Sequence, residues 1–204
     1  MTTVKGIEQG RADYAYKCVN QVLSLDTFIF DGKTIDFSDL FIKAYKDKFK
    51  KKLEKNQQNK DLLDAFLKDA ETNLSNWKNE KDNFEADLVN YFHKYAKEYK
   101  AYSRKIPMLI KTHGLGATFA YMKAKGKSDG TPYHLLYEQT QTWIQSRAYF
   151  NDYIQNDILK SIVELDSNKY RALTSEVITL FGWLKRFSEG LIEGEDDNNA
   201  QDVV

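Results

Sequence analysis

The sequence has little of what marks several common classes of protein. Its 204 residues include one cysteine, two prolines and ten glycines. A single cysteine, Cys18, excludes an intrachain disulfide, and the helical pattern around it predicts a small buried side chain. No apolar run approaches the ~20 residues of a membrane span, and the N-terminus lacks the apolar core of a secretory signal. We therefore expect a soluble cytoplasmic protein with no membrane contact.

Charge is distributed unevenly along a chain whose formal net charge is zero. Residues 193–202 contain five acidic residues and no Lys or Arg, so the rest of the chain carries five excess positive charges. Such a polar stretch has too little apolar surface to fold, which predicts a disordered, solubilising tail over 193–204. Residues 43–60 hold eight lysines and form either a nucleic-acid-binding face or a solvated helix face.

Scarce Pro and Gly beside abundant Lys, Leu, Ala and Glu predict an all-α fold. Apolar periodicity indicates a compact bundle of about six or seven helices in a single domain over residues 1–192. Residues 26–36 contain Asp-Gly between short β-favouring runs, but a lone hairpin makes no stable sheet, so a loop is predicted. The expected helical segments are 7–25, 38–53, 60–105 with a candidate break at 75–79, 106–111, 115–125, 133–150, 151–165 and 169–189.

Two glycine-containing stretches resemble nucleotide-binding motifs only in part. Gly126-Lys-Ser matches the end of a phosphate-binding loop, but the first glycine of that motif would fall at Tyr121. Gly114 and Gly116 begin a dinucleotide-binding fingerprint whose third glycine would be Phe119. Both matches fail, because the preceding residues also favour helix over strand.

The histidines offer no metal or catalytic cluster. His93, His113 and His134 stand 20 and 21 residues apart without a ligand partner at metal-binding spacing. His113 could act as a general base, but a His before a helix-interrupting Gly more often belongs to a packed turn. We expect no metal, no cofactor and no enzymatic activity.

The last expected helix has a clear division between its faces. Leu173, Val177, Leu180, Leu184 and Phe187 recur at spacings of four and three and define the buried side. At about 100° per residue, the opposite arc contains Gly182 and three cations. Those cations, Arg171, Lys185 and Arg186, form either an ordinary exposed face or a place where a partner can approach closely.

Three segments stand in a specific order along the chain. They are Arg11–Val19 (RADYAYKCV), Tyr102–Lys125 (YSRKIPMLIKTHGLGATFAYMKAK) and Tyr170–Gly190 (YRALTSEVITLFGWLKRFSEG), with a helix over 133–144 between the last two. Together they resemble the small subunit of the Cmr complex, the type III-B CRISPR effector. The resemblance implies an all-α, non-catalytic subunit, stacked in several copies beside backbone subunits that hold the guide RNA. It also implies that target cleavage belongs to the backbone subunits and polymerase-type chemistry to the large subunit.

The chain departs from this family between the first two segments. Family members pass quickly from the first helix to the second segment, whereas here residues 26–100 intervene. We expect a helical insertion over 26–100 that enlarges the bundle or contacts a neighbouring subunit.

A subunit that lines a guide–target duplex needs cations aimed at phosphates, because base pairing already reads the sequence. The candidate RNA-binding residues are Arg11, Arg104, Lys105, Lys111, Lys123, Lys125, Arg171, Lys185 and Arg186. The expected partners are the backbone and large subunits, other copies of this chain, the guide RNA and the target RNA. The alternative hypothesis is a stand-alone helical adaptor that binds proteins through its aromatic stripes and has no nucleic-acid role.

Overall fold

A computed structural model describes residues 4–24, 27–30, 33–36, 53–54, 56–68, 84–126, 131–154 and 157–193. Its helices are α1 (Val4–Ser24), α3 (Gln57–Lys68), α5 (Phe84–His113), α6 (Leu115–Gly126), α7 (Pro132–Gln145), α8 (Ala148–Asn151), α9 (Ile158–Glu164) and α10 (Ser167–Leu191). Its strands are β1 (Thr27–Phe30) and β2 (Lys33–Asp36). The predicted helical bundle is confirmed, with one small hairpin added to it.

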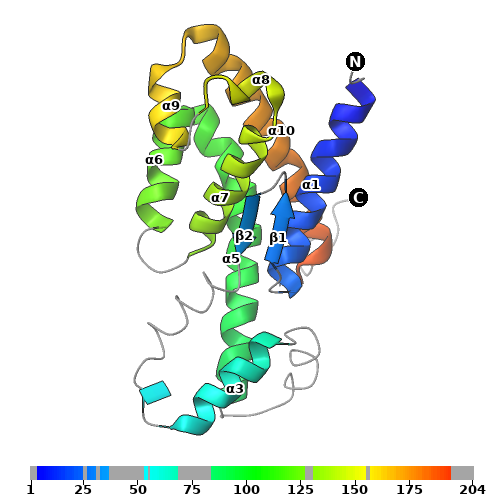
Figure 1. Cartoon of the computed structure of the whole chain (residues 1–204), viewed down its shortest axis with the longest axis vertical. Helices are drawn as coiled ribbons and strands as arrows, with labels where there is room; N and C mark the ends of the chain where they lie inside the picture. The colour runs from blue at the N-terminus through cyan, green and yellow to red at the C-terminus, as the bar shows by residue number, and fades with distance from the viewer. Residues whose placement is uncertain are drawn as a thin grey trace, which may run out of the picture.

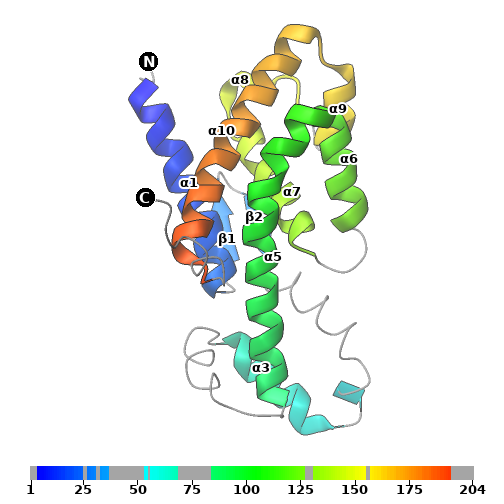
Figure 2. The same ribbon diagram turned by 180° about the vertical axis from the view of Figure 1, so that it is seen from behind.

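The bundle is organised around α5, which runs along most of the length of the molecule (Figures 1 and 2). α10 packs against α5 in the opposite direction, and α1 lies along the other side of α10. α7 packs against α5 and α6, and α9 contacts α6. The N-terminal part of α5 extends beyond these helices and contacts α3.

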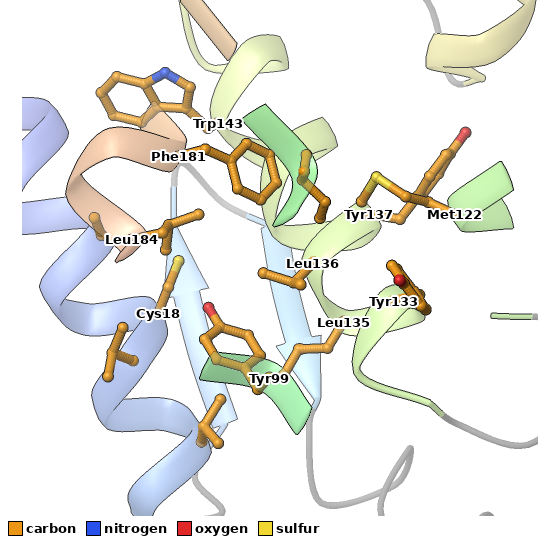
Figure 3. Packing of buried hydrophobic residues seen from close by; sticks show 14 of the residues in the cluster. Cys18, Tyr99, Met122, Tyr133, Leu135, Leu136, Tyr137, Trp143, Phe181 and Leu184 are labelled. Carbon is orange, nitrogen blue, oxygen red and sulfur yellow. The ribbon is translucent and has the colours of Figure 1, made fainter. Parts of the chain in front are cut away.

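The core lies where α1, α5, α7 and α10 meet. Figure 3 shows Cys18 of α1, Tyr99 of α5, Leu136 of α7 and Leu184 of α10 gathered there, and all four are fully buried. Burial of a large aliphatic side chain stabilises the fold by roughly 1.5–3 kcal/mol. The expected burial of Cys18 is confirmed, and burial raises the pKa of its thiol, so this cysteine serves packing rather than chemistry.

One buried glutamine connects three helices of this core. The side-chain oxygen of Gln139 in α7 accepts a hydrogen bond from Tyr99 Oη of α5 at 2.7 Å. Its Nε2 donates to the Cys18 carbonyl at 3.2 Å and to Gln21 Oε1 at 3.1 Å, both in α1. Its backbone carbonyl accepts a bond from Tyr14 Oη at 2.6 Å. These bonds hold α1, α5 and α7 in one relative register.

α5 is a single helix, so the predicted division into helices over 60–105 and 106–111 is wrong. Pro107 lies inside it. An interior proline removes one hydrogen bond and costs about 3 kcal/mol or more in helix stability. Here Ile106 and Ile110 are buried on either side of Pro107, and Ser103 Oγ lies 2.9 Å from Ser188 Oγ of α10. Packing along both turns keeps the helix continuous.

The helices predicted over 133–150 and 151–165 are both too long. α7 ends at Gln145, because Ser146 Oγ donates to the Trp143 carbonyl at 2.6 Å and Arg147 adopts an extended backbone. In the second segment α9 begins only after Asp157, whose side chain accepts a bond from the Leu159 N–H at 3.0 Å.

The loop predicted over residues 26–36 is also wrong, because the structure contains an antiparallel hairpin there. Thr27 pairs with Asp36 and Phe30 with Lys33. An isolated two-stranded hairpin is marginal in water. β1 contacts α1 and β2 contacts α7, so the bundle supplies the support that the hairpin alone lacks.

The remaining predictions are confirmed, stay predictions, or concern positions outside the described residues. α1, α6 and α10 confirm the helices expected over 7–25, 115–125 and 169–189. None of the described helices is both long and apolar enough to cross a membrane. The single-domain boundary and the insertion over 26–100 stay predictions. The predictions that lie wholly or mainly outside the described residues concern the helix over 38–53, the lysines of 43–60, the break at 75–79 and the acidic tail beyond Glu193.

Candidate nucleic-acid interface

The stretch His113–Gly116 is a tight corner between α5 and α6, as expected from its glycines. Gly114 has φ 85°, a conformation that residues other than glycine rarely adopt. The Leu115 N–H, at the start of α6, donates to Tyr170 Oη of α10 at 2.9 Å. A Cβ on Gly114 would lie 3.2 Å from that same oxygen. The corner turns α6 back along α5, and the two helices pack against each other.

A row of exposed cations runs along the solvent side of α5. Exposed residues recur there at spacings of three and four, and Figure 2 shows this helix between α10 and α6. From residue 94 to residue 111 the row spans about 26 Å at 1.5 Å per residue. Its cations are Lys94, Lys97, Arg104, Lys105 and Lys111.

Sequence reasoning missed the first two members of this row. Lys94 lies 3.8 Å from Glu98 across a surface ion pair, and Lys97 is exposed to solvent on the next turn. The signal was the spacing of three and four residues along positions 94, 97, 101, 104, 108 and 111, which places them on one side of a helix. A predicted helix boundary at residue 105 interrupted that periodicity, whereas the continuous α5 restores it.

Arg171 and Lys185 extend the row onto α10. Arg104 Nε of α5 lies 3.1 Å from Glu189 Oε1 of α10, which marks the side of α10 that faces α5. Lys185 precedes Glu189 by about one turn and Arg171 precedes it by about five turns, so both lie on that side. Both are exposed. We call the surface formed by the following residues the basic face: Lys94, Lys97, Arg104, Lys105, Lys111, Arg171 and Lys185.

Arg186 is exposed but turns toward α1 instead. Its guanidinium lies 5.0 Å from the ring centre of Trp183, and Trp183 Nε1 donates to Glu8 Oε2 of α1 at 3.2 Å. A Cβ on Gly182 would meet nothing within 4 Å, so the surface between Lys185 and Arg186 is open. The arc predicted for the three α10 cations is therefore exposed. Arg171 and Lys185 lie on its side toward α5, whereas Arg186 lies on its side toward α1.

The two lysines near the end of α6 face different surroundings. Lys123 Nζ lies 2.8 Å from Asp157 Oδ2, and this hydrogen bond holds the pKa of the carboxyl below its ordinary value. Lys125 is exposed, and its Nζ lies 6.0 Å from the ring centre of Tyr121, on the side of α6 toward α5. Lys125 borders the basic face, whereas Lys123 points toward α9.

Arg11 is held by carboxylates inside the fold. Its Nε lies 2.9 Å from Glu176 Oε1 and a second guanidinium nitrogen lies 2.6 Å from Glu176 Oε2, while Glu8 binds the third nitrogen. The hydrogen bonds that Arg11 donates to Glu176 raise the pKa of Arg11. The side chains of Arg11 and Glu176 are only 13% and 11% exposed, and Trp143 Nε1 also donates to Glu176 at 2.8 Å. This bidentate pair connects α1 to α10.

Replacing Glu176 by glutamine is expected to lower the free energy of unfolding by about 2 kcal/mol at pH 7, because Arg11 then loses its ionised partner in a partly buried site. Chemical denaturation measures the effect. The matched control is Glu8→Gln, whose carboxylate is 45% exposed and whose loss should cost less than about 1 kcal/mol.

The same pair predicts a pH dependence. Burial raises the pKa of Glu176, but hydrogen bonds from Arg11 and Trp143 outweigh burial, so the folded-state pKa lies below the ordinary 4.5. The stabilisation is therefore complete above about pH 4.5 and is lost as pH falls through the lower folded-state value. The difference between the original chain and the Glu176→Gln variant should shrink below pH 4.5. A difference that grows on acidification would contradict this assignment.

The structure places His93 and His113 in α5 and His134 in α7. No three described His, Cys, Asp or Glu side chains lie close enough to hold a metal ion. His113 is exposed at the end of α5, with Nδ1 2.7 Å from Thr112 Oγ1. The Thr112 hydroxyl also donates to the Met108 carbonyl at 2.9 Å, which is an ordinary arrangement for the last turn of a helix.

A family model described as CRISPR-associated protein (Cas_Cmr5) matches residues 78–191, more than half of the chain. The chain belongs to this family. The match contains α5 through α10, and with them the corner at Gly114 and every residue of the basic face. It begins within the segment expected to be an insertion and does not include Arg11–Val19.

A curated protein of Thermus thermophilus is also similar to this Cas_Cmr5 family member. That protein is described as "CRISPR system Cmr subunit Cmr5". It is 26% identical over 103 residues, which cover 47% of this chain and 76% of the relative. Together with the family match, this confirms the resemblance to the Cmr small subunit that three sequence segments indicated.

Proposed function

We propose that this Cas_Cmr5 family member is a non-catalytic, cytoplasmic small subunit of a type III-B Cmr effector that contacts RNA through its basic face. The strongest support is the row of exposed cations along one continuous helix, α5. A rigid helix holds these charges at spacings that do not change when RNA binds. Little ordering of the protein is then needed to place several cations against a phosphate backbone.

Backbone contact is the form of recognition that this role requires. In an RNA-guided complex, base pairing between guide and target reads the sequence, and the protein recognises backbone and shape. Lys and Arg contacts to phosphate supply affinity without sequence preference. A modest number of cations in each copy is enough, because several linked copies bind one RNA together.

We divide the nine candidate contacts by the surface on which they lie. Arg104, Lys105, Lys111, Arg171 and Lys185 belong to the basic face, and Lys125 borders it. We propose these six as the phosphate contacts. The other three lie off the basic face: Arg11 binds Glu176 and Glu8, Lys123 pairs with Asp157, and Arg186 lies over Trp183 on the side of α10 toward α1. Arg104 also pairs with Glu189, but it lies within the basic face.

The proposed partners are the backbone and large subunits, other copies of this chain, the guide RNA and the target RNA. Co-expression of all subunits with a guide RNA tests this assembly. An affinity tag on this chain should recover the other subunits and the guide RNA in one particle. Recovery of the chain without them would contradict the proposed function.

The alternative, a protein-interaction adaptor without RNA contact, has support from one aromatic surface. Tyr16 of α1 is 44% exposed, and its ring packs edge-on against that of Phe187 of α10, with ring centres 5.6 Å apart. The Phe187 ring stacks on Trp183, with ring centres 5.9 Å apart. Such a patch suits a protein neighbour. Two results together would favour this alternative. Nuclease treatment and charge reversal on the basic face would leave the amount of recovered protein partners unchanged. The charge-reversed complex would also retain target RNA as well as the original complex does.

A further inference from the structure

An apolar groove of about 290 Å³ lies between α5 and α6, next to the basic face. Its volume falls just below the range of roughly 300–1,000 Å³ that is typical for drug-sized ligands, so it suits a single ring system. α5 contributes one wall and α6 the other, and the corner at Gly114 closes one end. The lining residues are Lys105, Leu109, His113, Ala117, Thr118 and Tyr121.

The groove combines apolar walls with a supported aromatic ring. Leu109 and Ala117 form apolar parts of the two walls. Tyr121 is 38% exposed, and its ring packs edge-on against Tyr133 at 5.3 Å. Tyr133 in turn stacks on Tyr102 of α5 at 3.9 Å. This aromatic chain fixes Tyr121 before any ligand arrives, which limits the entropy lost on binding.

The rim of the groove is positively charged. Lys105 lines it directly, and Lys125 Nζ lies 6.0 Å from the ring centre of Tyr121. Among the described lining residues there is no Asp or Glu. A ligand that suits both parts has a flat apolar ring system attached to an anionic chain.

We propose that this groove binds one unpaired nucleobase of an RNA strand whose phosphates lie on the basic face. The proposal rests on the proposed function and adds a specific site to it. Stacking on tyrosine tolerates any base, because every base has a π-face. The imidazole of His113 and the amine of Lys105 lie where they can hydrogen-bond the base edge, and the adjoining phosphates reach Lys105 and Lys125.

The charge of the rim argues against the other simple occupants. A second copy of the chain in a symmetric contact would bring Lys105 and Lys125 against the same residues of its partner, which is unfavourable. A basic peptide would be repelled in the same way. An unpaired base on its phosphate chain matches the apolar walls and the rim together.

The experiment compares two fluorescent oligoadenylates of equal length, one normal and one with abasic sites at its centre, in anisotropy titrations with the full chain. The original protein should bind the normal strand about five- to tenfold more tightly, since base–aromatic stacking is worth a factor of this order or more. Ala117→Phe fills the groove and should remove this preference without weakening binding to the abasic strand. The matched control is Ala120→Phe, an exposed alanine of the same helix outside the groove, which should keep the preference.

A second pair of variants separates the ring from the fold. Tyr121→Phe retains the aromatic face and should behave as the original chain, whereas Tyr121→Leu should bind the normal strand no more tightly than the abasic one. One outcome would overturn the groove assignment alone. Ala117→Phe and Ala120→Phe would prefer the normal strand over the abasic strand to the same degree, while charge reversal on the basic face would still weaken RNA binding. Failure of the original chain to bind either strand would overturn both the groove and the RNA contact. If Ala117→Phe without RNA sediments differently from the original chain, its oligomeric state has changed. That result would assign the groove to contact with a second copy and overturn the proposal.

Discussion

Replacing Gln139 by alanine is expected to lower the free energy of unfolding by about 3 kcal/mol. The side chain is fully buried and bonds Tyr99 Oη, the Cys18 carbonyl and Gln21 Oε1. Alanine removes these buried hydrogen bonds and also opens a cavity. In a chain of 204 residues the melting temperature should fall by roughly 6–12 °C, which calorimetry measures directly.

Two further variants separate the polar and packing parts of this effect. Gln139→Met nearly preserves volume, so any remaining loss reports the missing hydrogen bonds. Gln57→Ala is the control, because Gln57 is exposed on α3 and its Nε2 donates across the surface to Asp61 Oδ1 at 3.2 Å. We expect a change of less than about 0.5 kcal/mol there. An Ala variant at 139 that is as stable as this control would show that the network does not hold the three helices.

Reversing two charges on the basic face, Lys111→Glu with Lys185→Glu, is expected to weaken binding of the isolated chain to single-stranded RNA at least about tenfold near 0.15 M salt. Each phosphate contact to single-stranded RNA contributes ~0.7 to the slope of log affinity against log salt, so loss of two should reduce that slope by ~1.4. Both lysines are exposed on packed helices, and the structure assigns neither an ion pair with a described residue. The fold should therefore tolerate the change.

The control for this double variant changes the net charge by the same amount at two lysines outside the basic face. Lys68 of α3 and Lys160 of α9 are exposed and lie off the basic face, so Lys68→Glu with Lys160→Glu should weaken binding far less. Anisotropy titrations at several salt concentrations give both affinity and slope. Equal losses in the two double variants would mean that net charge, rather than the basic face, governs RNA binding.

The structure also changes which charge reversals are informative. Reversal at Arg104 would place a carboxylate beside Glu189, and reversal at Arg186 would remove a cation from the Trp183 ring. Either change disturbs contacts within the protein as well as any contact with RNA. Lys111 avoids this ambiguity. Reversal at Lys185 places a carboxylate one turn before Glu189, but at an exposed helix position this costs only about 0.5 kcal/mol.

Several errors of prediction have the same physical origin. Pro107 is a strong local signal for the end of a helix, yet buried neighbours on both sides keep α5 continuous. The hairpin over 27–36 is weak by itself but rests against α1 and α7. In both cases a tertiary contact outweighs a local preference of a few kcal/mol.

Arg11 shows why a candidate site could be recognised only in part. As a cation on the first helix it resembles any other exposed arginine in the sequence. Glu176, which binds it, lies 165 residues away along the chain. No local pattern relates two positions so far apart, so only the packing of α1 on α10 reveals that this charge has a partner inside the fold.

The sequence by itself determined the helical class, the buried face of α10, the corner at Gly114 and the family. These features depend on backbone preferences and side-chain periodicity, which act over a few residues and can be read in order along the chain. Only the tertiary structure decided that α5 is continuous, that its cations form one basic face with those of α10, and that Arg11 is not part of it. Those outcomes depend on which helices pack together, because a neighbouring helix determines whether a charge meets a carboxylate or faces solvent.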